Sequence, residues 1–305
     1  MNENNLINLI KKQIGSKYIG DDCAYLKKLG LVVTQDSLVE NIHFRRDWIT
    51  PYQLGFKSMA VNISDIFASG AIPQYVTVSL SLPKNVNEDF VNEFYRGAKS
   101  SLYGAEIVGG DITGSQKDIF ISVTVIGSDE GRKISSRKNA KPGYVVITNG
   151  FYGTSVSGLR ELACGGDNQT LIKAHLEPVL NETFSREIAV FSKEDYAMMD
   201  CSDGLADALF KIASASGVKI KADYDKIPHL ESIQNSDDIL FGGEDYNLVA
   251  VVPESLLNSL SDYTVIGSVE EKSDETILEI GNKKYSLYDE LSVYNHFGDN
   301  TNGKS

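Results

Sequence analysis

The stretch GLVVTQDSLVENIHF, residues 30–44, begins as an apolar run, ends that run on Asp36 and then offers Glu40 and His43. A short segment rich in β-branched residues is typical of a β-strand. The same acidic ending recurs in three later segments, VNISD (61–65), VGGD (108–111) and MDCSD (199–203). One acid after an apolar run is an ordinary turn residue, but four of them indicate a functional site.

The chain of 305 residues is long enough for two domains of ordinary size or for one large α/β domain. No apolar run approaches the roughly 20 residues that a membrane-spanning helix needs. The amino terminus, MNENNLINLIKKQIG, lacks the basic start and the apolar stretch of a secretory signal. We therefore predict a cytoplasmic protein that does not interact with membranes.

The three cysteines are an odd number with wide spacing, which fits neither a disulfide framework nor a paired-thiol zinc site. Cys23 and Cys201 each stand beside acids, where a thiolate would be disfavoured. We expect both to be buried residues without a chemical role.

The charge balance is strongly acidic, with 29 Lys and Arg residues against 42 Asp and Glu residues and a formal net charge of −13. Without a basic excess, a protein cannot displace counterions from a nucleic-acid backbone, so we predict no nucleic-acid partner. If the ligand of so acidic a chain is itself an anion, metal cations are needed to hold it.

Strand-like and helical patterns both occur. The strand-like runs are LVVTQ (31–35), YVTVSLSL (75–82), IFISVTVIG (119–127), YVVIT (144–148), YNLVAVV (246–252) and YTVIGSV (263–269). Helical periodicity appears over residues 59–67, 90–102 and 205–213. The mixture predicts an α/β (α+β) fold.

A polar, basic stretch, GSDEGRKISSRKNAKPG (127–143), lies between apolar strands and is the best candidate for a domain junction. We place the boundary near residue 138, which gives an N-terminal domain of residues 1–138 and a C-terminal domain of residues 139–305. Composition alone favours a solvated linker here. The stretch also holds the densest positive charge of the chain, at Arg132, Lys133, Arg137, Lys138 and Lys141.

The acids have the pattern of a site for a hard cation. In an extended VVTQD segment, Thr34 and Asp36 are two residues apart and project from one face at the end of the strand. Magnesium is typically held by one or two carboxylates, waters and substrate phosphate oxygens, so separate elements must supply the acids. The candidates are Asp21, Asp22, Asp36, Asp65, Asp111, Asp200 and Asp203.

Most of these acids, taken singly, have a structural explanation. Asp203 precedes an amphipathic helix and would make a good N-cap, and Asp111 follows two glycines as turn residues do. Asp21 and Asp22 would suit the turn of a hairpin. Asp65 differs, because it falls inside a helical pattern of small and apolar residues, where an unpaired buried carboxylate is costly. We therefore expect Asp65 to have a partner.

Glycines near these acids suit phosphate contacts. Gly109 and Gly110 allow a backbone to approach a ligand closely, and their N–H groups can face phosphate oxygens. The segment NGFYGTSVSGL (149–159) is a glycine-bearing turn into a helix. The chain contains no Walker A sequence, so this is not a P-loop protein.

Eight short motifs follow one another along the chain: IGDDCA, TQDSLVENIHF, FKSMAVNISDIFASGA, YGAEIVGGDITG, RKNAKPG, MDCSDGLADAL, GGEDYNL and YNHF. In this order they resemble the motif series of the thiamine-monophosphate kinase family, within the superfamily of aminoimidazole ribonucleotide synthetase. The resemblance runs from about residue 19 to residue 297. Eight motifs in register are far more specific than any one of them.

The resemblance implies a two-domain synthetase-like fold and a homodimer. The N-terminal mixed sheets of two subunits would pair into a shared barrel, with the nucleotide across the interface, and a C-terminal α/β domain would complete the active site. The implied reaction converts ATP and thiamine monophosphate to ADP and thiamine diphosphate, with several Mg²⁺ ions. This is the reaction of a phosphotransferase of thiamine biosynthesis whose acceptor is a phosphate group.

The resemblance also implies roles for individual residues. The metal ligands would be Asp22, Thr34, Gln35, Asp36, Asp65, Asp111, Asp200 and Asp203. The nucleotide contacts would be Tyr103, Gly110, Asp111, Arg137 and Ser202. The substrate contacts would be His43, Glu244 and Tyr294. The catalytic residues would be Asp36, Asp65, Asp111 and Asp203.

Some positions depart from the family pattern. Gln35 stands where a threonine or serine is usual, although its amide or backbone oxygen can still coordinate a metal. Ile112, Gly114 and Ser115 replace residues of the usual Thr-Thr-Arg-Gly, and Tyr144 replaces an acid. None of these changes removes a carboxylate.

The implied chemistry needs no general base, because a phosphate monoester has a second pKa of about 6 and is mostly a dianion at neutral pH. Catalysis then rests on charge neutralisation and in-line positioning. Glu244 would offer thiamine a charge or hydrogen-bond partner, and Tyr294 a stacking face. The alternatives are a structural imidazole for His43 and packing of a C-terminal segment for Tyr294.

Three other functions are alternatives. Another ATP-dependent synthetase of the same superfamily would act on a different small substrate, and a selenide enzyme would show a reactive cysteine or selenocysteine near the amino terminus. A calcium-binding module would concentrate its acids in a D-x-[DN]-x-[DN]-G loop, and this chain has none. A metal phosphohydrolase would release free phosphate without an acceptor.

Overall fold

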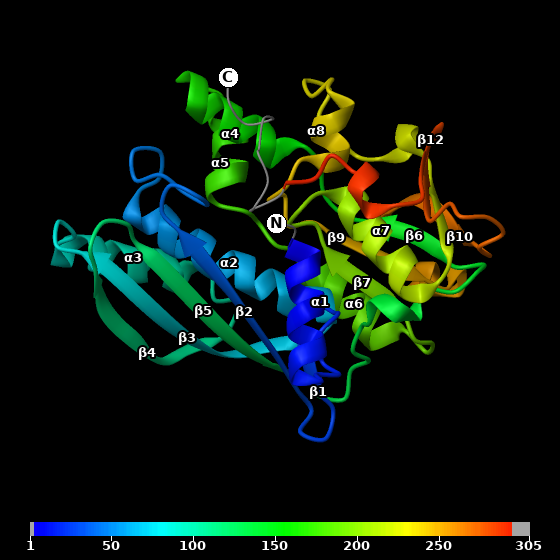
Figure 1. The fold of residues 1–305 in the computed structure, drawn as a ribbon, viewed down its shortest axis with the longest axis horizontal. Helices are drawn as coiled ribbons and strands as arrows, with labels where there is room; N and C mark the ends of the chain where they lie inside the picture. Colours follow the sequence, from blue (N-terminus) through cyan, green and yellow to red (C-terminus); the bar gives the residue numbers. More distant parts are fainter. Residues whose placement is uncertain (1–2, 295–305) are drawn as a thin grey trace.

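Two mixed β-sheets form the frame of the protein, and the computed structural model describes residues 3–294 (Figure 1). The first sheet has the order β1-β2-β5-β3-β4, in which only β3 and β4 are parallel neighbours. Its strands are β1 (Ala24–Leu26), β2 (Leu31–Val39), β3 (Ile72–Pro83), β4 (Glu106–Ser115) and β5 (Phe120–Ser128).

The second sheet has the order β12-β11-β8-β10-β6-β9-β7, in which only β11 and β8 are parallel neighbours. Its strands are β6 (Val145–Thr148), β7 (Ala197–Asp200), β8 (Lys219–Ala222), β9 (Leu248–Val252), β10 (Thr264–Glu270), β11 (Leu278–Ile280) and β12 (Lys283–Tyr285).

Eight α-helices and four short 3-10 helices complete the described residues. The α-helices are α1 (Glu3–Ile14), α2 (Pro51–Ser69), α3 (Glu88–Ser100), α4 (Thr154–Cys164), α5 (Gln169–Leu176), α6 (Glu182–Phe191), α7 (Leu205–Ser216) and α8 (Ser236–Phe241). The 3-10 helices are η1 (Arg137–Asn139), η2 (Tyr224–Lys226), η3 (Glu254–Ser259) and η4 (Tyr288–Glu290).

Helix α2 joins the two halves of the molecule. Its start is fixed by a capping box between Thr50 and Gln53 and by Pro51 in the first turn, and Gly70 ends it in a left-handed conformation. The helix lies against one face of the first sheet, and its C-terminal part reaches β7 and α6 of the other half (Figure 1). Residues on different sides of α2 can therefore contact both halves.

The apolar core has two parts, which the second sheet separates. Along β9, Leu248, Ala250 and Val252 belong to the cluster that contains α2 and α6, whereas Val249 and Val251 belong to the cluster that contains α7. Successive strand residues point to opposite faces, so a sheet covered on both faces needs a continuously apolar strand. This explains why β9 reads LVAVV.

All six strand-like runs and all three helical periodicities predicted from the sequence are confirmed as β2, β3, β5, β6, β9, β10, α2, α3 and α7. The prediction that the first strand ends on Asp36 is wrong, because β2 pairs with β5 in unbroken register as far as Val39. Asp111 likewise lies inside β4 and not in a turn. Asp200 does end a strand, β7.

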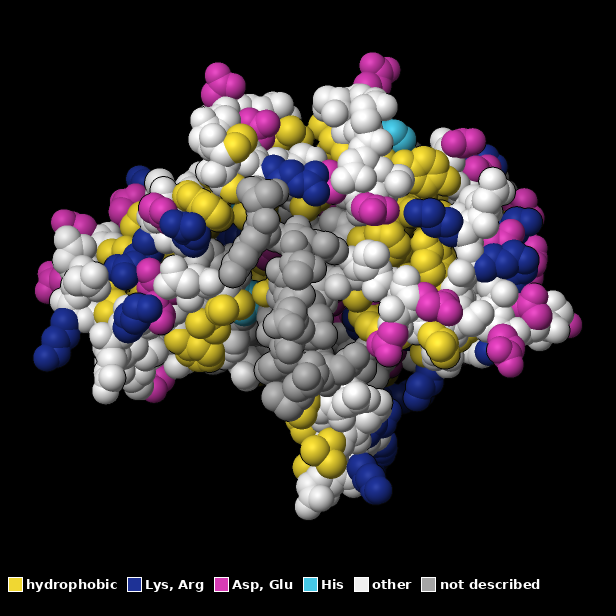
Figure 2. Space-filling view, turned by 45° about the horizontal axis from the view of Figure 1, so that its top comes forward, with side chains coloured by type: hydrophobic (Ala, Val, Ile, Leu, Met, Phe, Trp, Pro, Cys, Tyr) yellow, Lys and Arg dark blue, Asp and Glu magenta, His cyan; other side chains and the backbone are white. Residues whose placement is uncertain are grey.

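On the face shown in Figure 2, acidic and basic side chains of the described residues are interspersed, without a large basic patch. None of the helices between residues 3 and 294 combines the length and apolar character that a bilayer crossing requires. Cys23 and Cys201 are buried, as predicted.

Candidate active site

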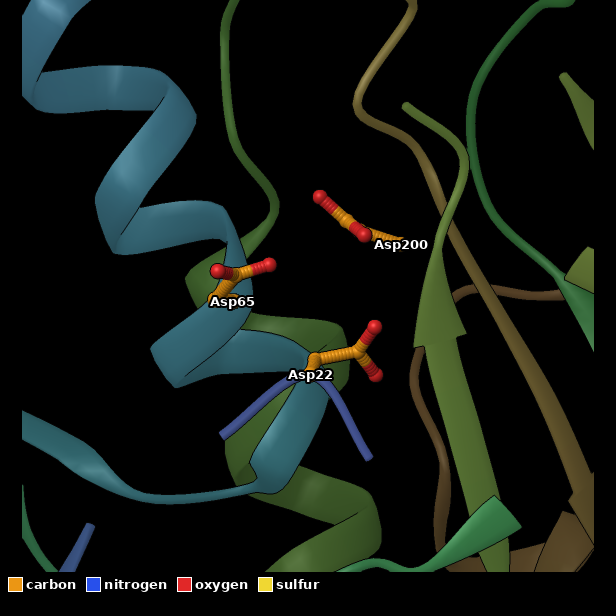
Figure 3. Close-up of side chains that lie close together, drawn as sticks. All are labelled: Asp22, Asp65 and Asp200. Atoms are coloured by element: carbon orange, nitrogen blue, oxygen red, sulfur yellow. The ribbon is translucent and has the colours of Figure 1, made fainter. Parts of the chain in front are cut away.

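Three carboxylates from three separate elements converge between the two halves of the protein (Figure 3). Asp22 precedes β1, Asp65 lies in α2, and Asp200 ends β7. Each contributes an oxygen, and these oxygens all lie within 4.8 Å of one another. Folding thus brings together acids that are up to 178 residues apart in the sequence, from position 22 to position 200.

Polar side chains hold these carboxylates and align β2 and β7 with α2. The Thr34 hydroxyl donates a hydrogen bond of 2.5 Å to Asp65, which confirms that Asp65 has a partner. The Ser64 hydroxyl donates one of 2.7 Å to Asp200. The backbone N–H of Asp36 donates to the buried Asn62 side chain at 2.8 Å, so Asp36 also lies next to α2.

The electrostatics of this cluster favour a bound cation. Burial, followed by repulsion from Asp200 and other acids, raises the pKa of Asp65 well above its usual value. Burial and Asp22 raise the pKa of Asp200 to about 8. Like charges so close together cannot all remain ionised unless a positive charge joins them. A carboxylate set of this kind has the hard oxygen donors that Mg²⁺ prefers, so the residues fit the metal.

Arg137 supplies part of that positive charge. Its guanidinium donates to Asp22 at 2.6 Å, and its backbone N–H donates to Asp21 at 2.8 Å. Burial opposes the charge, but Asp22 raises the pKa of Arg137 above its usual value. Its Nε is buried and has no hydrogen-bond partner among the described residues. The reading of this stretch as a solvated linker is therefore wrong for Arg137.

The loop between β7 and α7 carries Ser202 and Asp203. The N-cap of α7 is Gly204, so Asp203 is not the N-cap. Lys211 of α7 lies 3.5 Å from Asp203 and 2.7 Å from Asp207. The Asp203 carboxylate is thus paired with Lys211, while the Asp22 carboxylate is paired with Arg137.

Glu244 lies in the loop GGEDY, which packs directly on this β7–α7 loop. Its backbone N–H donates to the Ser202 carbonyl at 2.7 Å, and a Cβ at Gly243 would lie 2.7 Å from the same carbonyl oxygen. Glu244 adopts a left-handed conformation with φ 65°, which is uncommon for a residue with a side chain. Glu244, the predicted substrate residue, is therefore hydrogen-bonded to the loop that carries Asp203.

Two residues near Glu244 were missed by sequence reasoning. Lys57 of α2, only 1% exposed, forms an ion pair of 3.1 Å with Glu244. His175 of α5 lies 3.5 Å from the same carboxylate oxygen. A lysine among the small and apolar residues of this helix could have pointed to the first, because a buried charge requires a partner. No signal in the sequence pointed to His175.

His43 has a local structural role as well as a place near Glu244. Its Nδ1 accepts a hydrogen bond of 3.0 Å from the backbone N–H of Val39. Nδ1 is therefore occupied as an acceptor, which leaves Nε2 as the protonated nitrogen of the neutral ring. His43 is also close enough to contribute to lowering the pKa of Glu244, although less than Lys57 does.

Other predicted residues lie apart from the carboxylate cluster on this chain. Asp111 and Gly110 are on β4, three strands from Asp36 in the sheet order, or about 14 Å at the usual strand spacing. A Cβ at Gly110 would lie 1.8 Å from the Val78 carbonyl oxygen, so close strand packing already requires this glycine. Thus β4 cannot bring Asp111 to the cluster of its own chain.

Gln35 and Tyr103 make hydrogen bonds within the chain, and Tyr294 lies at the end of the described residues. The Gln35 amide oxygen accepts from Thr124, on the opposite face of β2 from Thr34. The Tyr103 hydroxyl accepts from the backbone N–H of Leu180. Tyr294 is 50% exposed at the end of the described residues, and the rest of the YNHF motif lies outside them.

Comparisons with known proteins identify the family of the chain. Models of AIR synthase related proteins match the chain twice, with the N-terminal domain at residues 20–128 and the C-terminal domain at residues 141–279. Thiamine-monophosphate kinase of Aquifex aeolicus is 37% identical over 89% of this chain and 92% of its own length. The enzyme of the same name from Bacillus subtilis is 33% identical over 92% of this chain and 93% of its own length.

A solved structure extends the likeness to three dimensions. AaThiL complexed with AMPPCP and TMP is 34% identical, and the match covers 97% of each chain with a TM-score of 0.87. The mixed, two-domain AIR synthase-like fold expected from the motifs is thereby confirmed. The chain belongs to the thiamine-monophosphate kinase family.

Proposed function

We propose that the protein transfers the γ-phosphoryl group of ATP directly to the phosphate of thiamine monophosphate, forming ADP and thiamine diphosphate. The observation that carries this proposal is the convergence of Asp22, Asp65 and Asp200 beside the Glu244 loop, in a chain of this family. The relative bound to AMPPCP, an ATP analogue, and to TMP supports both substrates.

The chain's own residues perform binding and orientation in this reaction. The acceptor phosphate is mostly a dianion at neutral pH, so no side chain has to remove a proton from it. The main obstacle is repulsion between two phosphate groups, which an acidic protein cannot relieve with its own carboxylates. Mg²⁺ held by Asp22, Asp65 and Asp200, with Asp36 and Asp203 adjacent, would neutralise this negative charge. Thr34, Ser64 and Arg137 keep three of these carboxylates in place.

The residues that bind the two substrates divide between the two sides of the site. Glu244 and His43 would contact thiamine monophosphate, because they lie together beside α2 and the β7–α7 loop. Arg137 and Ser202 would contact the nucleotide, and the buried Nε of Arg137, which has no hydrogen-bond partner within residues 3–294, would donate to a phosphate oxygen. Tyr294 at the end of the described chain is proposed as a further thiamine contact.

We propose that Asp111, Gly110 and Tyr103 act at the site of a second copy of the chain. The position of Asp111 on the far edge strand is explained if β4 of one subunit completes the partner's nucleotide site. The outer face of the first sheet exposes large apolar side chains, including Tyr75 at 47% and Phe120 at 41%. Pairing two such faces into a barrel would bury them and form the homodimer.

The homodimer leads to a specific prediction. Phe120→Asp places a charge on the face that would be buried, and an unpaired charge in an interface is costly. We expect this variant to sediment as a monomer in analytical ultracentrifugation and to lose activity. Val190→Asp, on an exposed residue of α6, is the control and should remain dimeric. A Phe120→Asp variant that is dimeric and active would contradict the proposed interface.

The remaining predictions from the sequence complete the proposal. Residues 1–138 would form the domain that binds ATP and Mg²⁺ and dimerises, and residues 139–305 the domain that completes the active site. The boundary falls between the segments matched by the two family models. A cytoplasmic location also stays a prediction.

Phosphorus NMR of the protein with ATP, Mg²⁺ and thiamine monophosphate tests the proposed function. We expect the two coupled signals of thiamine diphosphate to appear together with those of ADP. Inorganic phosphate without thiamine diphosphate would instead identify a phosphohydrolase. No turnover with thiamine monophosphate would favour another small substrate of the same superfamily.

A further inference from the structure

A group of buried polar residues lies on the substrate side of the site and has no role in the proposed chemistry so far. Lys57 of α2 is 1% exposed, and its ammonium lies 3.1 Å from Oε2 of Glu244. His175 lies 3.5 Å from the same oxygen and 2.9 Å from the Ser155 hydroxyl. Four elements therefore meet at one carboxylate: α2, the GGEDY loop, α5 and the start of α4.

The protonation states of Lys57 and His175 show which of them neutralises the charge of Glu244. Burial, with Lys57 nearby, lowers the pKa of His175 to about 4, so the imidazole is neutral at pH 7. Lys57 is thus the positive charge that balances Glu244, and it holds the pKa of that carboxyl below its usual range despite burial. Removing one member of a buried ion pair leaves the other uncompensated.

The orientation of Glu244 follows from the same contacts. Both short contacts of its carboxylate go to Oε2, while 29% of the side chain is exposed. The backbone is fixed separately, by the hydrogen bond from its N–H to Ser202 and by the left-handed φ of 65°. The backbone and Oε2 are both fixed in this way, and neither of the two contacts uses Oε1.

We propose that Lys57 is a positioning residue for thiamine monophosphate, which acts through Glu244 by holding Oε2 and presenting Oε1 to the substrate. It also cancels a negative charge that Glu244 would otherwise add beside the carboxylates and phosphates of the site. This inference rests on the proposed function, because it assigns Lys57 to the thiamine side of the same reaction.

Helix α2 explains how Lys57 can serve this role. Lys57 and Ser64 are seven residues apart, so they lie on the same side of the helix, two turns or about 10 Å from each other. Ser64 holds Asp200 at 2.7 Å, and Lys57 holds Glu244 at 3.1 Å. One rigid helix face thus sets the spacing between the metal carboxylates and the substrate carboxylate.

The test is a double-mutant cycle of Lys57→Met and Glu244→Gln, read in steady-state kinetics of thiamine diphosphate formation. We expect K57M to raise the KM for thiamine monophosphate at least about tenfold, since a hydrogen bond to a charged group is lost. The KM for ATP should stay within about twofold of the wild type, because Lys57 contacts Glu244 and not the nucleotide side. The double variant should have the same KM for thiamine monophosphate as E244Q alone.

Several results would overturn this role. If the KM effects of K57M and E244Q multiply, Lys57 acts independently of Glu244. If K57M changes kcat and both KM values equally, Lys57 only supports the fold. Lys219→Met is the control, because Lys219 is largely buried, with 11% of its side chain exposed, and is paired with a glutamate, Glu279, but lies in β8. Should K57M fail to fold, Lys57→Gln keeps a donor for Glu244 and must give a smaller increase in the same KM.

The wild-type measurement separates this inference from the proposed function. If the wild type forms thiamine diphosphate and K57M matches it in every constant, the role of Lys57 is wrong and the function stands. If the wild type neither binds nor phosphorylates thiamine monophosphate, the proposed function fails and the role of Lys57 fails with it.

Discussion

Asp65→Asn should reduce kcat by about 1,000-fold or more while leaving the protein folded. Changes that merely weaken the support of a metal ligand already cost about 10- to 100-fold, and Asp65 is itself one of the three converging carboxylates. Asparagine keeps the shape of the side chain and an oxygen that can accept from Thr34. Steady-state kinetics with saturating ATP and Mg²⁺ gives the loss directly.

The same substitution should raise thermal stability in the absence of Mg²⁺. Asp65 is buried near Asp22 and Asp200, and their repulsion raises its pKa well above the usual value. A neutral side chain removes that repulsion, so we expect Asp65→Asn to have a higher Tm than the wild type in EDTA. Loss of activity together with gain of stability separates a functional carboxylate from a structural one.

A matched acid provides the control for Asp65. Asp195→Asn removes a carboxylate that is 64% exposed and paired with Lys133 at 2.9 Å, away from the cluster. This variant should keep wild-type activity, since exposed ion pairs contribute little. If Asp65→Asn retained activity at saturating Mg²⁺, the assignment of the metal site to this cluster would be wrong.

How far the sequence predicts the fold is seen best in its strands. Runs such as IFISVTVIG identified β5, because β-branched residues with alternating burial leave a clear pattern. The ends of strands were harder to predict. Polar residues within β2 and β4 resembled terminators, yet pairing with neighbouring strands carries β2 through Asp36 to Val39 and β4 through Asp111. Strand length is set by the partner strand, which a local pattern does not contain.

Some residues of the site could be predicted from the sequence, and others could not. The acids were identified because a carboxylate in an apolar setting, such as Asp65 in α2, has to be compensated. Lys57 lies eight residues before Asp65 in the same helix and was overlooked, since its partner, Glu244, is 187 residues away in the sequence. Pairings between distant segments depend on how α2 packs against the second half of the protein. Periodicity along a single helix cannot reveal them.

In the absence of metal, the contribution of Asp200 to the free energy of unfolding should fall as pH rises from about 4 to about 8. Burial and Asp22 raise its folded-state pKa from 3.8 to about 8. In this window the folded state binds more protons than the unfolded state, so stability decreases with increasing pH. Each unit of difference between the folded-state and unfolded-state pKa changes the free energy of unfolding by about 1.4 kcal/mol.

Comparison of the wild type with Asp200→Asn in thermal unfolding isolates this contribution. In EDTA, the Tm of Asp200→Asn should exceed that of the wild type by a margin that grows between pH 5 and pH 8. With Mg²⁺ present, the order should reverse at pH 8, because the ion binds the ionised carboxylates of the folded wild type and stabilises it by mass action. A wild-type Tm at pH 8 that is unchanged by Mg²⁺ would show that the three carboxylates do not bind the metal, and the proposed mechanism would lose its basis.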